Sequence, residues 1–256
     1  MRRGTKDMLL CIFFYGEDLE LARKIRVVRK SCARGAEDAS GLTVIIDVFR
    51  AFSCAPLFFH FHAGKVIFEA DPDRAIILKE QHPEFILVGE INEVPIEGAD
   101  LGNSPSEILM KGEAYFKERV VIHRTTAGIT GVAAALQNGA EVLLGSFLTA
   151  GSTARYINKI GPDMVTLVAM GERAERKAPE DEACADYLEH LLTGSPYDHI
   201  QTLKEIIFQP SAQKFILGKK EYLPREDPIF CLQRDLFDFV LSVREENNEI
   251  VVFKRD

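Results

Sequence analysis

Short runs of apolar residues recur along the chain, each bounded by polar or glycine-bearing segments and separated by stretches long enough for a helix. Uninterrupted apolar runs of this kind are typical of strands that are buried on both faces. The pattern therefore predicts an α/β fold. The runs that we expect to form strands are Met8–Tyr15, Thr43–Ile46, Lys65–Glu69, Phe85–Val88, Arg119–Ile122, Val142–Leu144 and Met164–Ala169.

Two stretches of the chain repeat the same order of elements. Residues 43–68 and residues 119–144 each give an apolar strand, a polar turn, a helix-length segment and a second strand. We expect a single domain over residues 1–256, with two related half-units at about 43–105 and 119–243. In open α/β sheets, ligands bind beyond the carboxyl ends of the strands, so polar residues just after each strand are the first candidates for a functional site.

The N-terminal part of the chain combines an apolar run with a basic segment, which predicts a strand and a basic helix within residues 8–36. In such a helix, Leu19, Leu21, Ile25 and Val28 would form the buried side. The basic side chains would then lie on a solvated face rather than form a nucleic-acid patch. These residues are Arg23, Lys24, Arg26, Arg29, Lys30 and Arg34.

Charge and cysteine content limit the partners and the compartment. The chain has 31 basic and 39 acidic residues and a net charge of −8, which gives no general attraction to nucleic acid or to an anionic membrane surface. No apolar run approaches the roughly 18 residues of a membrane span. Five cysteines without a CxxC pair are typical of reduced thiols. We expect a cytoplasmic protein without nucleic-acid or membrane partners.

Asp47 directly follows the apolar run Thr43–Ile46, and Arg50 comes three residues later. A carboxylate at a strand end can hold a divalent cation, and an arginine beside it can bind phosphate or carboxylate through two parallel hydrogen bonds. The alternative is an internal salt bridge that only closes the turn.

Thr125–Gly131 is rich in hydroxyl groups and glycine, and it leads into an alanine-rich helix around Val132–Leu136. Backbone N–H groups at a helix start, together with threonine hydroxyls, can bind an anion. The same turn could serve only as a helix cap. His123 just before it is either structural or catalytic. Ser146 follows a further strand and adds a hydroxyl at the same edge of the sheet.

Three carboxylates on successive segments could converge on one hard cation. Glu90 follows a strand, Asp100 lies in a loop rich in turn formers, and Asp47 has been described above. Magnesium typically takes one or two carboxylates together with waters and phosphate oxygens. Glu180, Asp181 and Glu182 precede a helix over Ala183–Leu192, where the helix dipole alone favours acidic residues, and this explanation accounts for at least one of them.

Taken in order along the chain, these motifs resemble the 2-phosphosulfolactate phosphatase family. The resemblance covers about Thr43 to Val243, and DLGNSP in register with DVxRA and GSFL is its most specific part. The matching segments are Asp47–Ala51, Gly89-Glu90, Pro95–Gly98, Asp100–Pro105, Thr125-Thr126 with Gly128, Gly145–Leu148, Glu180-Asp181 with Cys184-Ala185, and Asp227–Asp235.

The resemblance implies a three-layer α/β/α fold around a mostly parallel or mixed sheet. It also implies a Mg²⁺-dependent phosphatase that hydrolyses phosphate esters of 2-hydroxy acids, with sulfolactate as the parent product in coenzyme M biosynthesis. The implied catalytic residues are Asp47, Arg50 and Glu90. The implied substrate-binding residues are Asn103, Ser104, Thr125, Thr126, Gly128 and Ser146. The implied Mg²⁺ ligands are Asp47, Glu90, Asp100 and Asp181, and Glu180 also lies on a motif position.

The chain departs from the family pattern at three places. Gly-Glu-Arg-Gly-Gly is replaced by Gly89-Glu90-Ile91-Asn92-Glu93, the motif Thr-Asn-Gly-Thr becomes Thr126–Ile129, and an asparagine becomes Thr149. Loss of a guanidinium would remove a charge-assisted hydrogen bond worth about 1.5–3 kcal/mol from sulfonate recognition.

These departures leave alternatives beside the phosphatase. The chain could be a catalytically silent member that binds a metabolite or anion or acts in regulation, or a phosphotransferase that needs an acceptor. Asp47 could also act as a covalent nucleophile. The aromatic residues Phe58, Phe59 and Phe61 belong either to the core or to a contact in a homo-oligomer.

Overall fold

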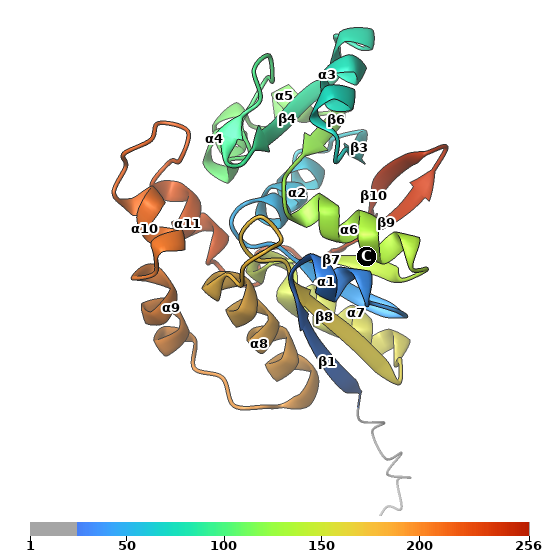
Figure 1. Cartoon of the computed structure of the whole chain (residues 1–256), viewed down its shortest axis with the longest axis vertical. Helices are drawn as coiled ribbons and strands as arrows, with labels where there is room; N and C mark the ends of the chain where they lie inside the picture. The colour runs from blue at the N-terminus through green and yellow to red at the C-terminus, as the bar shows by residue number, and fades with distance from the viewer. Residues whose placement is uncertain (1–24, 256) are drawn as a thin grey trace, which may run out of the picture.

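The structure is a computed structural model that describes residues 25–255 (Figure 1). The predicted strand Met8–Tyr15 and the first part of the predicted basic helix lie outside these residues. In the described part of the chain, ten strands form one mixed sheet flanked by helices, which confirms the predicted α/β class and its three layers.

The strands lie in the spatial order β1-β8-β2-β7-β9-β10-β3-β6-β4-β5. Their bounds are β1 Arg26–Ser31, β2 Leu42–Ile46, β3 Lys65–Phe68, β4 Ile86–Ile91, β5 Val94–Pro95, β6 Val120–Arg124, β7 Glu141–Gly145, β8 Met164–Ala169, β9 Val240–Glu246 and β10 Glu249–Arg255. The helices are α1 Cys32–Glu37, α2 Ala51–His60, α3 Pro72–Gln81, α4 Pro105–Lys111, α5 Glu113–Phe116, α6 Gly128–Gln137, α7 Ala150–Ile160, α8 Pro179–Thr193, α9 His199–Ile207, α10 Pro210–Ile216 and α11 Glu226–Cys231, with a 3₁₀ turn at Phe147–Thr149.

The sheet consists of two parallel blocks joined by a hairpin. One block is β1-β8-β2-β7 and the other is β3-β6-β4. The hairpin β9–β10 lies between them and pairs antiparallel with β7 on one side and with β3 on the other. Its two-residue turn, Asn247-Asn248, has φ values of 51° and 63°, a left-handed conformation that asparagine tolerates better than most residues.

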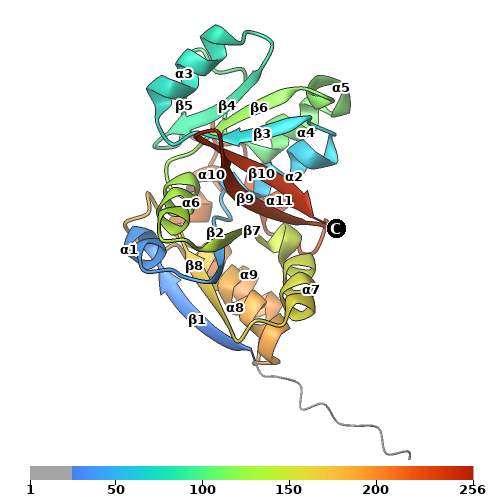
Figure 2. The same ribbon diagram turned by 90° about the vertical axis from the view of Figure 1, so that its right-hand side faces the viewer.

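The two blocks meet at their carboxyl ends because the sheet turns. Three antiparallel steps separate β7 from β3, and in a flat sheet an odd number of reversals would place the carboxyl ends of the blocks at opposite edges. Figure 2 shows β3, β6 and β4 lying at a steep angle to β1 and β8, with the hairpin between them. Strand twist accumulated over these steps brings the ends of β2, β8, β4 and β6 to one place.

Each of the two repeated units places one strand in each block of the sheet. The unit β2–α2–β3 begins in one block and ends in the other, and β6–α6–β7 crosses in the reverse direction. Consequently β2 pairs with β7, and β3 pairs with β6. Neither unit forms a separate half of the sheet. That the two units are related in sequence stays a prediction.

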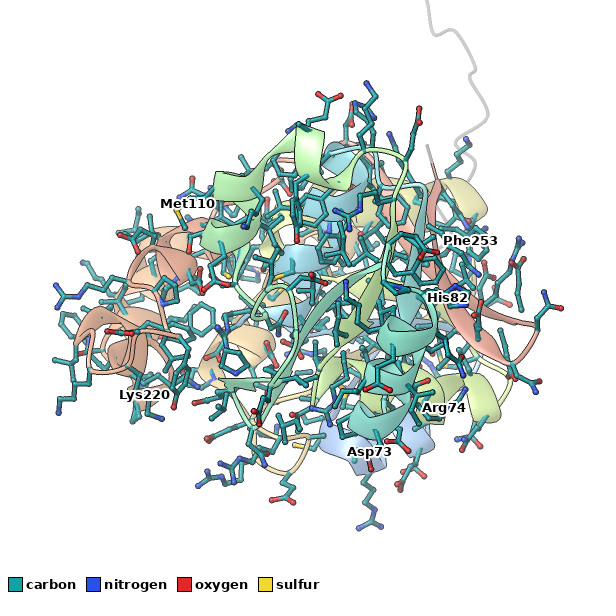
Figure 3. All side chains as sticks on the ribbon, turned by 90° about the horizontal axis from the view of Figure 1, so that it is seen from above. Asp73, Arg74, His82, Met110, Lys220 and Phe253 are labelled. Carbon is teal, nitrogen blue, oxygen red and sulfur yellow. The ribbon has the colours of Figure 1, made fainter. Side chains whose placement is uncertain are left out.

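Helices cover both faces of the sheet and bury most of its strands. One large apolar cluster lies among α1, α2 and α6, and a second lies among α7, α8, α9 and α10. Phe58 on α2 is fully buried in the first cluster, and Phe59 and Phe61 pack against it, which confirms their interpretation as core residues. On the outer side of the smaller block, α3 packs on β4 and exposes Asp73, Arg74 and His82 (Figure 3).

Six of the predicted strands lie in the described part of the chain, and all six form. The basic helix is wrong as predicted, because Arg26–Ser31 is the edge strand β1, paired parallel with β8, and only the short helix α1 follows. Val27 and Val28 are β-branched and favour an extended backbone, and basic residues are suited to an edge strand, which they protect from further pairing.

The basic residues of β1 make internal contacts. Arg29 donates to Asp186, Glu182 and Glu189, all on α8, and Lys30 donates to the Asp38 carbonyl oxygen. These contacts hold β1 against α8 and the end of α1, and that the segment binds no nucleic acid stays a prediction. None of the helices between residues 25 and 255 combines the length and apolarity needed to cross a bilayer.

Candidate active site

A small pocket of about 70 Å³ lies where the carboxyl ends of the two blocks meet. Eight of the residues expected at a site line it, and they come from the ends of β2, β4 and β6, the loop before α4 and the start of α8. These residues are Asp47, Arg50, Glu90, Asn103, Thr125, Thr126, Glu180 and Asp181.

Asp47 lies between the starts of two helices. The backbone N–H groups of Ala51, the first residue of α2, and of Gly128, the first residue of α6, lie near its carboxylate and lower its pKa. Helix starts carry partial positive charge, so both stabilise the carboxylate. Burial and the nearby Glu90 charge outweigh this effect and raise the pKa of Asp47 to about 7.

Gly128 is required by the close approach of α6 to Asp47. A Cβ atom at this position would lie 2.9 Å from Asp47 Oδ2 and 2.9 Å from the Phe52 ring. Phe52 is part of the core and cannot move away easily. The residue that was expected to bind substrate therefore shapes the pocket by leaving room for Asp47.

Glu90 holds the turn after β6 and the turn after β4 together. Its carboxylate accepts from the backbone N–H of Thr126 at 2.7 Å, from the Thr126 hydroxyl at 3.2 Å, and from the backbone N–H of Glu93. The Thr126 hydroxyl in turn accepts from the backbone N–H of Asn92 at 3.1 Å. Asn92 and Glu93 form the tip of the β4–β5 hairpin, with φ values of 50° and 76°.

The acidic triplet at the start of α8 divides between two surroundings. Asp181 accepts from the backbone N–H of Val48 at 2.7 Å and of Gly171 at 2.8 Å, and so ties the loop after β2 to the loop after β8. Glu180 accepts from the Ser211 hydroxyl at 2.7 Å. Burial raises the pKa of both carboxyls. Glu182 does not line the pocket and contacts Arg29 and Ser31 instead.

Arg50 is buried and held from three sides. Its guanidinium donates to the Tyr222 carbonyl oxygen at 3.0 Å and to the Glu93 carbonyl oxygen at 3.3 Å, and it lies 3.7 Å from the Asp227 carboxylate. It also stands 5.5 Å from the centroid of the Phe215 ring. The salt bridge between Asp47 and Arg50 that was the alternative to a binding role does not form; Asp227 on α11 is the counter-ion.

Two polar side chains of the pocket wall are positioned for a ligand. Asn103 Oδ1 lies 3.0 Å from His123 Nε2, which as the N–H tautomer donates to it and leaves the Asn103 amide NH₂ free for the pocket. His123 is fully buried against Phe58 and Phe68 and has a structural position. The Thr125 hydroxyl is buried without a protein partner, although buried polar groups normally have one.

Four of the expected site residues do not line the pocket: Gly128, described above, and Asp100, Ser104 and Ser146. Asp100 accepts from the Leu87 backbone N–H and pairs with Lys79, each at 2.8 Å, so the structure removes it from the expected metal ligands. Ser104 caps α4 and donates to Asp227 at 2.8 Å. Ser146 is fully buried behind the wall, and its hydroxyl has no protein partner.

One side of the pocket was not predicted from the sequence, because its residues are far along the chain from the motifs that were recognised. Ser211, Lys214 and Phe215 come from α10, and Arg173 comes from the loop after β8. Lys214 pairs with Glu93 at 2.5 Å. No strand end or turn motif precedes α10, so only the three-dimensional structure brings these residues to the site.

The pocket contains carboxylates that can bind a cation, but these side chains do not surround an ion by themselves. In the part of the chain that the structure describes, no three His, Cys, Asp or Glu side chains are arranged to hold a metal ion by themselves. Asp47 and Glu90 nevertheless repel each other, as the raised pKa of Asp47 shows. A hard cation that takes one or two carboxylates and completes its shell with water fits such a pair.

Comparison with known proteins identifies what the chain is similar to. The family model of 2-phosphosulpholactate phosphatase matches residues 30–246. Proteins named probable 2-phosphosulfolactate phosphatase are similar to it: one from Bacillus subtilis is 28% identical and covers 80% of this chain and 88% of its own. One from Caldanaerobacter subterraneus is 30% identical, with 78% and 87% covered, and one from Thermus thermophilus is 27% identical, with 84% and 92% covered.

Proposed function

Because the chain belongs to the 2-phosphosulfolactate phosphatase family, we propose that it hydrolyses the phosphate ester of a small 2-hydroxy acid in the pocket around Asp47. The observation that carries the proposal is the convergence of Asp47, Glu90 and Arg50 with the start of α6, all buried at one point. Such an arrangement places a cation site and anion-stabilising donors side by side, as phosphoryl transfer requires.

We further propose that the reaction depends on Mg²⁺, which Asp47 and Glu90 would hold together with water. When bound, the ion would offset the negative charge of the phosphoryl oxygens. Asp181 lies close enough to Asp47 for their charges to interact, and it adds to the attraction for a cation. Through the backbone N–H groups of Val48 and Gly171, it also positions the loops after β2 and β8 around the ion.

The residues of this chain then position the ester and move one proton. Arg50 and the free Thr125 hydroxyl donate to the phosphoryl oxygens, where charge develops in the transition state. The Asn103 amide NH₂ binds the substrate, with its orientation fixed by His123. Glu180 accepts the proton from the attacking water, because its raised pKa makes it a stronger base than an ordinary glutamate. The water oxygen bonds to phosphorus as the P–O bond to the hydroxy acid breaks, and the alkoxide leaving group takes up a proton from solvent to leave as the 2-hydroxy acid.

The test measures phosphate release from phosphorylated 2-hydroxy acids with Mg²⁺ and with a chelator. We expect turnover only with the metal, and a loss of about 100-fold or more in kcat for Asp47→Asn. Asp73→Asn, an exposed acid at the start of α3, is the matched control and should keep full activity. A folded protein that releases no phosphate from any ester would contradict the proposal and favour a silent, metabolite-binding member of the family.

A phosphoenzyme trap separates the two possible routes. The backbone N–H groups of Ala51 and Gly128 stabilise the Asp47 carboxylate and so lower its nucleophilicity. We therefore expect attack by water and no acid-stable phosphoryl group on the protein. A phosphoryl group found on Asp47 after rapid quenching would show instead that the reaction passes through a covalent intermediate.

A further inference from the structure

The outer side of the pocket carries an ion pair whose charged groups bond to each other rather than to Asp47, Arg50 or Glu90. Lys214 Nζ on α10 lies 2.5 Å from Glu93 Oε1 at the tip of the β4–β5 hairpin. Each side chain is 28% exposed, whereas Asp47, Arg50 and Glu90 are at most 6% exposed. The pair therefore stands between the buried phosphoryl site and solvent, where the rest of a bound substrate would lie.

Lys214 is held close to the phosphoryl site. Its ammonium lies 5.4 Å from the centroid of the Phe215 ring, and the Arg50 guanidinium lies 5.5 Å from the same centroid. The backbone of Glu93 accepts from Arg50 while its side chain pairs with Lys214. A small ester whose phosphate meets Arg50 thus has its remaining groups near Lys214.

Lys214, unlike Arg50, can exchange its anionic partner with little loss of free energy. Arg50 is fixed by two carbonyl oxygens and by Asp227, and it is buried. An ion pair that is more than a quarter exposed is weak, because water competes for both charges. A carboxylate or sulfonate of the substrate can therefore replace the Glu93 side chain on the ammonium, and the long glutamate side chain can turn to solvent.

We propose that Lys214 binds the second anionic group of the substrate, and that Glu93 competes with that group and so sets the selectivity for it. The inference rests on the proposed function and adds a specificity-determining pair to it. The occupant is a carboxylate or a sulfonate, which share the chemistry of an oxyanion bound to an ammonium group.

The test compares esters of one carbon skeleton with and without the second anion. Isopropyl phosphate lacks the second anion, and 2-phospholactate carries a carboxylate. The third ester, 2-(phosphonooxy)propane-1-sulfonate, carries a sulfonate. The readout is the ratio of kcat/KM for each charged ester to that for isopropyl phosphate. We expect Lys214→Met to lower the ratio about 10-fold or more and Glu93→Gln to raise it about 3-fold or more. The charged ester with the larger change identifies the group that Lys214 binds.

Glu249→Gln is the matched control, since the pair Lys65–Glu249 has the same distance of 2.5 Å, is similarly exposed at 39% and 29%, and does not line this pocket. It should leave the ratio unchanged. Opposite shifts for the two variants of the pair would support the proposal. Equal losses for charged and uncharged esters, or shifts of the same sign in both variants, would overturn it and leave the pair a structural contact.

Calorimetric binding of lactate and of 3-sulfolactate separates this inference from the proposed function. If no ester is hydrolysed, the proposed function fails, and binding alone decides the role of Lys214. Weaker binding in Lys214→Met with tighter binding in Glu93→Gln would support it. No binding to the unmodified protein, or equal binding in all three proteins, would overturn it. Thermal unfolding of each variant confirms that it is folded.

Discussion

At the scale of single residues, the candidate site depends on side chains that follow strand ends. Asp47, Glu90 and Thr125 could be selected from the sequence because each occurs where an apolar run stops, and the structure brings them to one pocket. Asp100, which was chosen from a loop rich in turn formers, points away from the pocket, toward Lys79 and the backbone of Leu87. A local pattern places a residue near a sheet edge and does not fix the direction of its side chain.

Gly128 allows the sharpest prediction at this scale. Gly128→Ala would bring a Cβ atom within 2.9 Å of Asp47 Oδ2 and of the Phe52 ring, so one of them must shift. We expect kcat to fall about 10-fold or more and the free energy of unfolding to drop by about 1–3 kcal/mol. Phosphate release and urea unfolding measure the two effects. Gln137→Ala, on the exposed end of the same helix, should change neither, and normal activity of Gly128→Ala would show that Asp47 does not need its observed position.

At the scale of elements, α10 and α11 complete a site that the sheet begins. Strands were predictable from apolar runs, whereas α10 is short and carries no motif, so its position follows only from its packing against α9 and α11. Asp227 on α11 illustrates how the packing of these helices brings a side chain to the site. Its carboxylate accepts from Ser104 at 2.8 Å and from the Ser106 hydroxyl at 2.6 Å, both on α4 or at its start, and it also faces Arg50 just before α2.

Asp227→Asn separates these two roles of α11. The amide oxygen can still accept from the serines of α4, but the charge that faces Arg50 is lost. We expect kcat/KM to fall about 10-fold as Arg50 shifts, with a loss of about 1–3 kcal/mol in the free energy of unfolding. Ser106→Ala removes one link between α4 and α11 without touching Arg50, and it should lower stability alone. Equal activity losses in both variants would mean that the link between the helices, rather than the charge, controls Arg50.

At the scale of the whole molecule, one buried histidine couples stability to pH. Burial lowers the pKa of His123 to about 3, from about 6.5 in the unfolded chain. Between these values the unfolded chain binds one more proton than the folded protein, so the free energy of unfolding decreases as the pH falls. From pH 7.5 to 5 this residue alone should remove about 2 kcal/mol.

Urea unfolding of the protein and of His123→Gln at pH 7.5 and pH 5 measures this effect. Glutamine can still donate to Asn103 but does not titrate. We expect the variant to lose about 2 kcal/mol less than the unmodified protein over this range. Other groups titrate equally in both proteins and cancel in the comparison. Parallel pH dependences would mean that His123 becomes protonated within the folded state.

The hairpin β9–β10 also determines when the site can form during synthesis. Residues 240–255 leave the ribosome after every other described element, yet they fill the gap in the sheet between β7 and β3. Until they emerge, the nascent chain exposes two unpaired strand edges, which are sites for wrong pairing with other chains. Translation pauses or holding chaperones that act just before this hairpin emerges would therefore affect the yield of this protein more than the same events earlier in the chain.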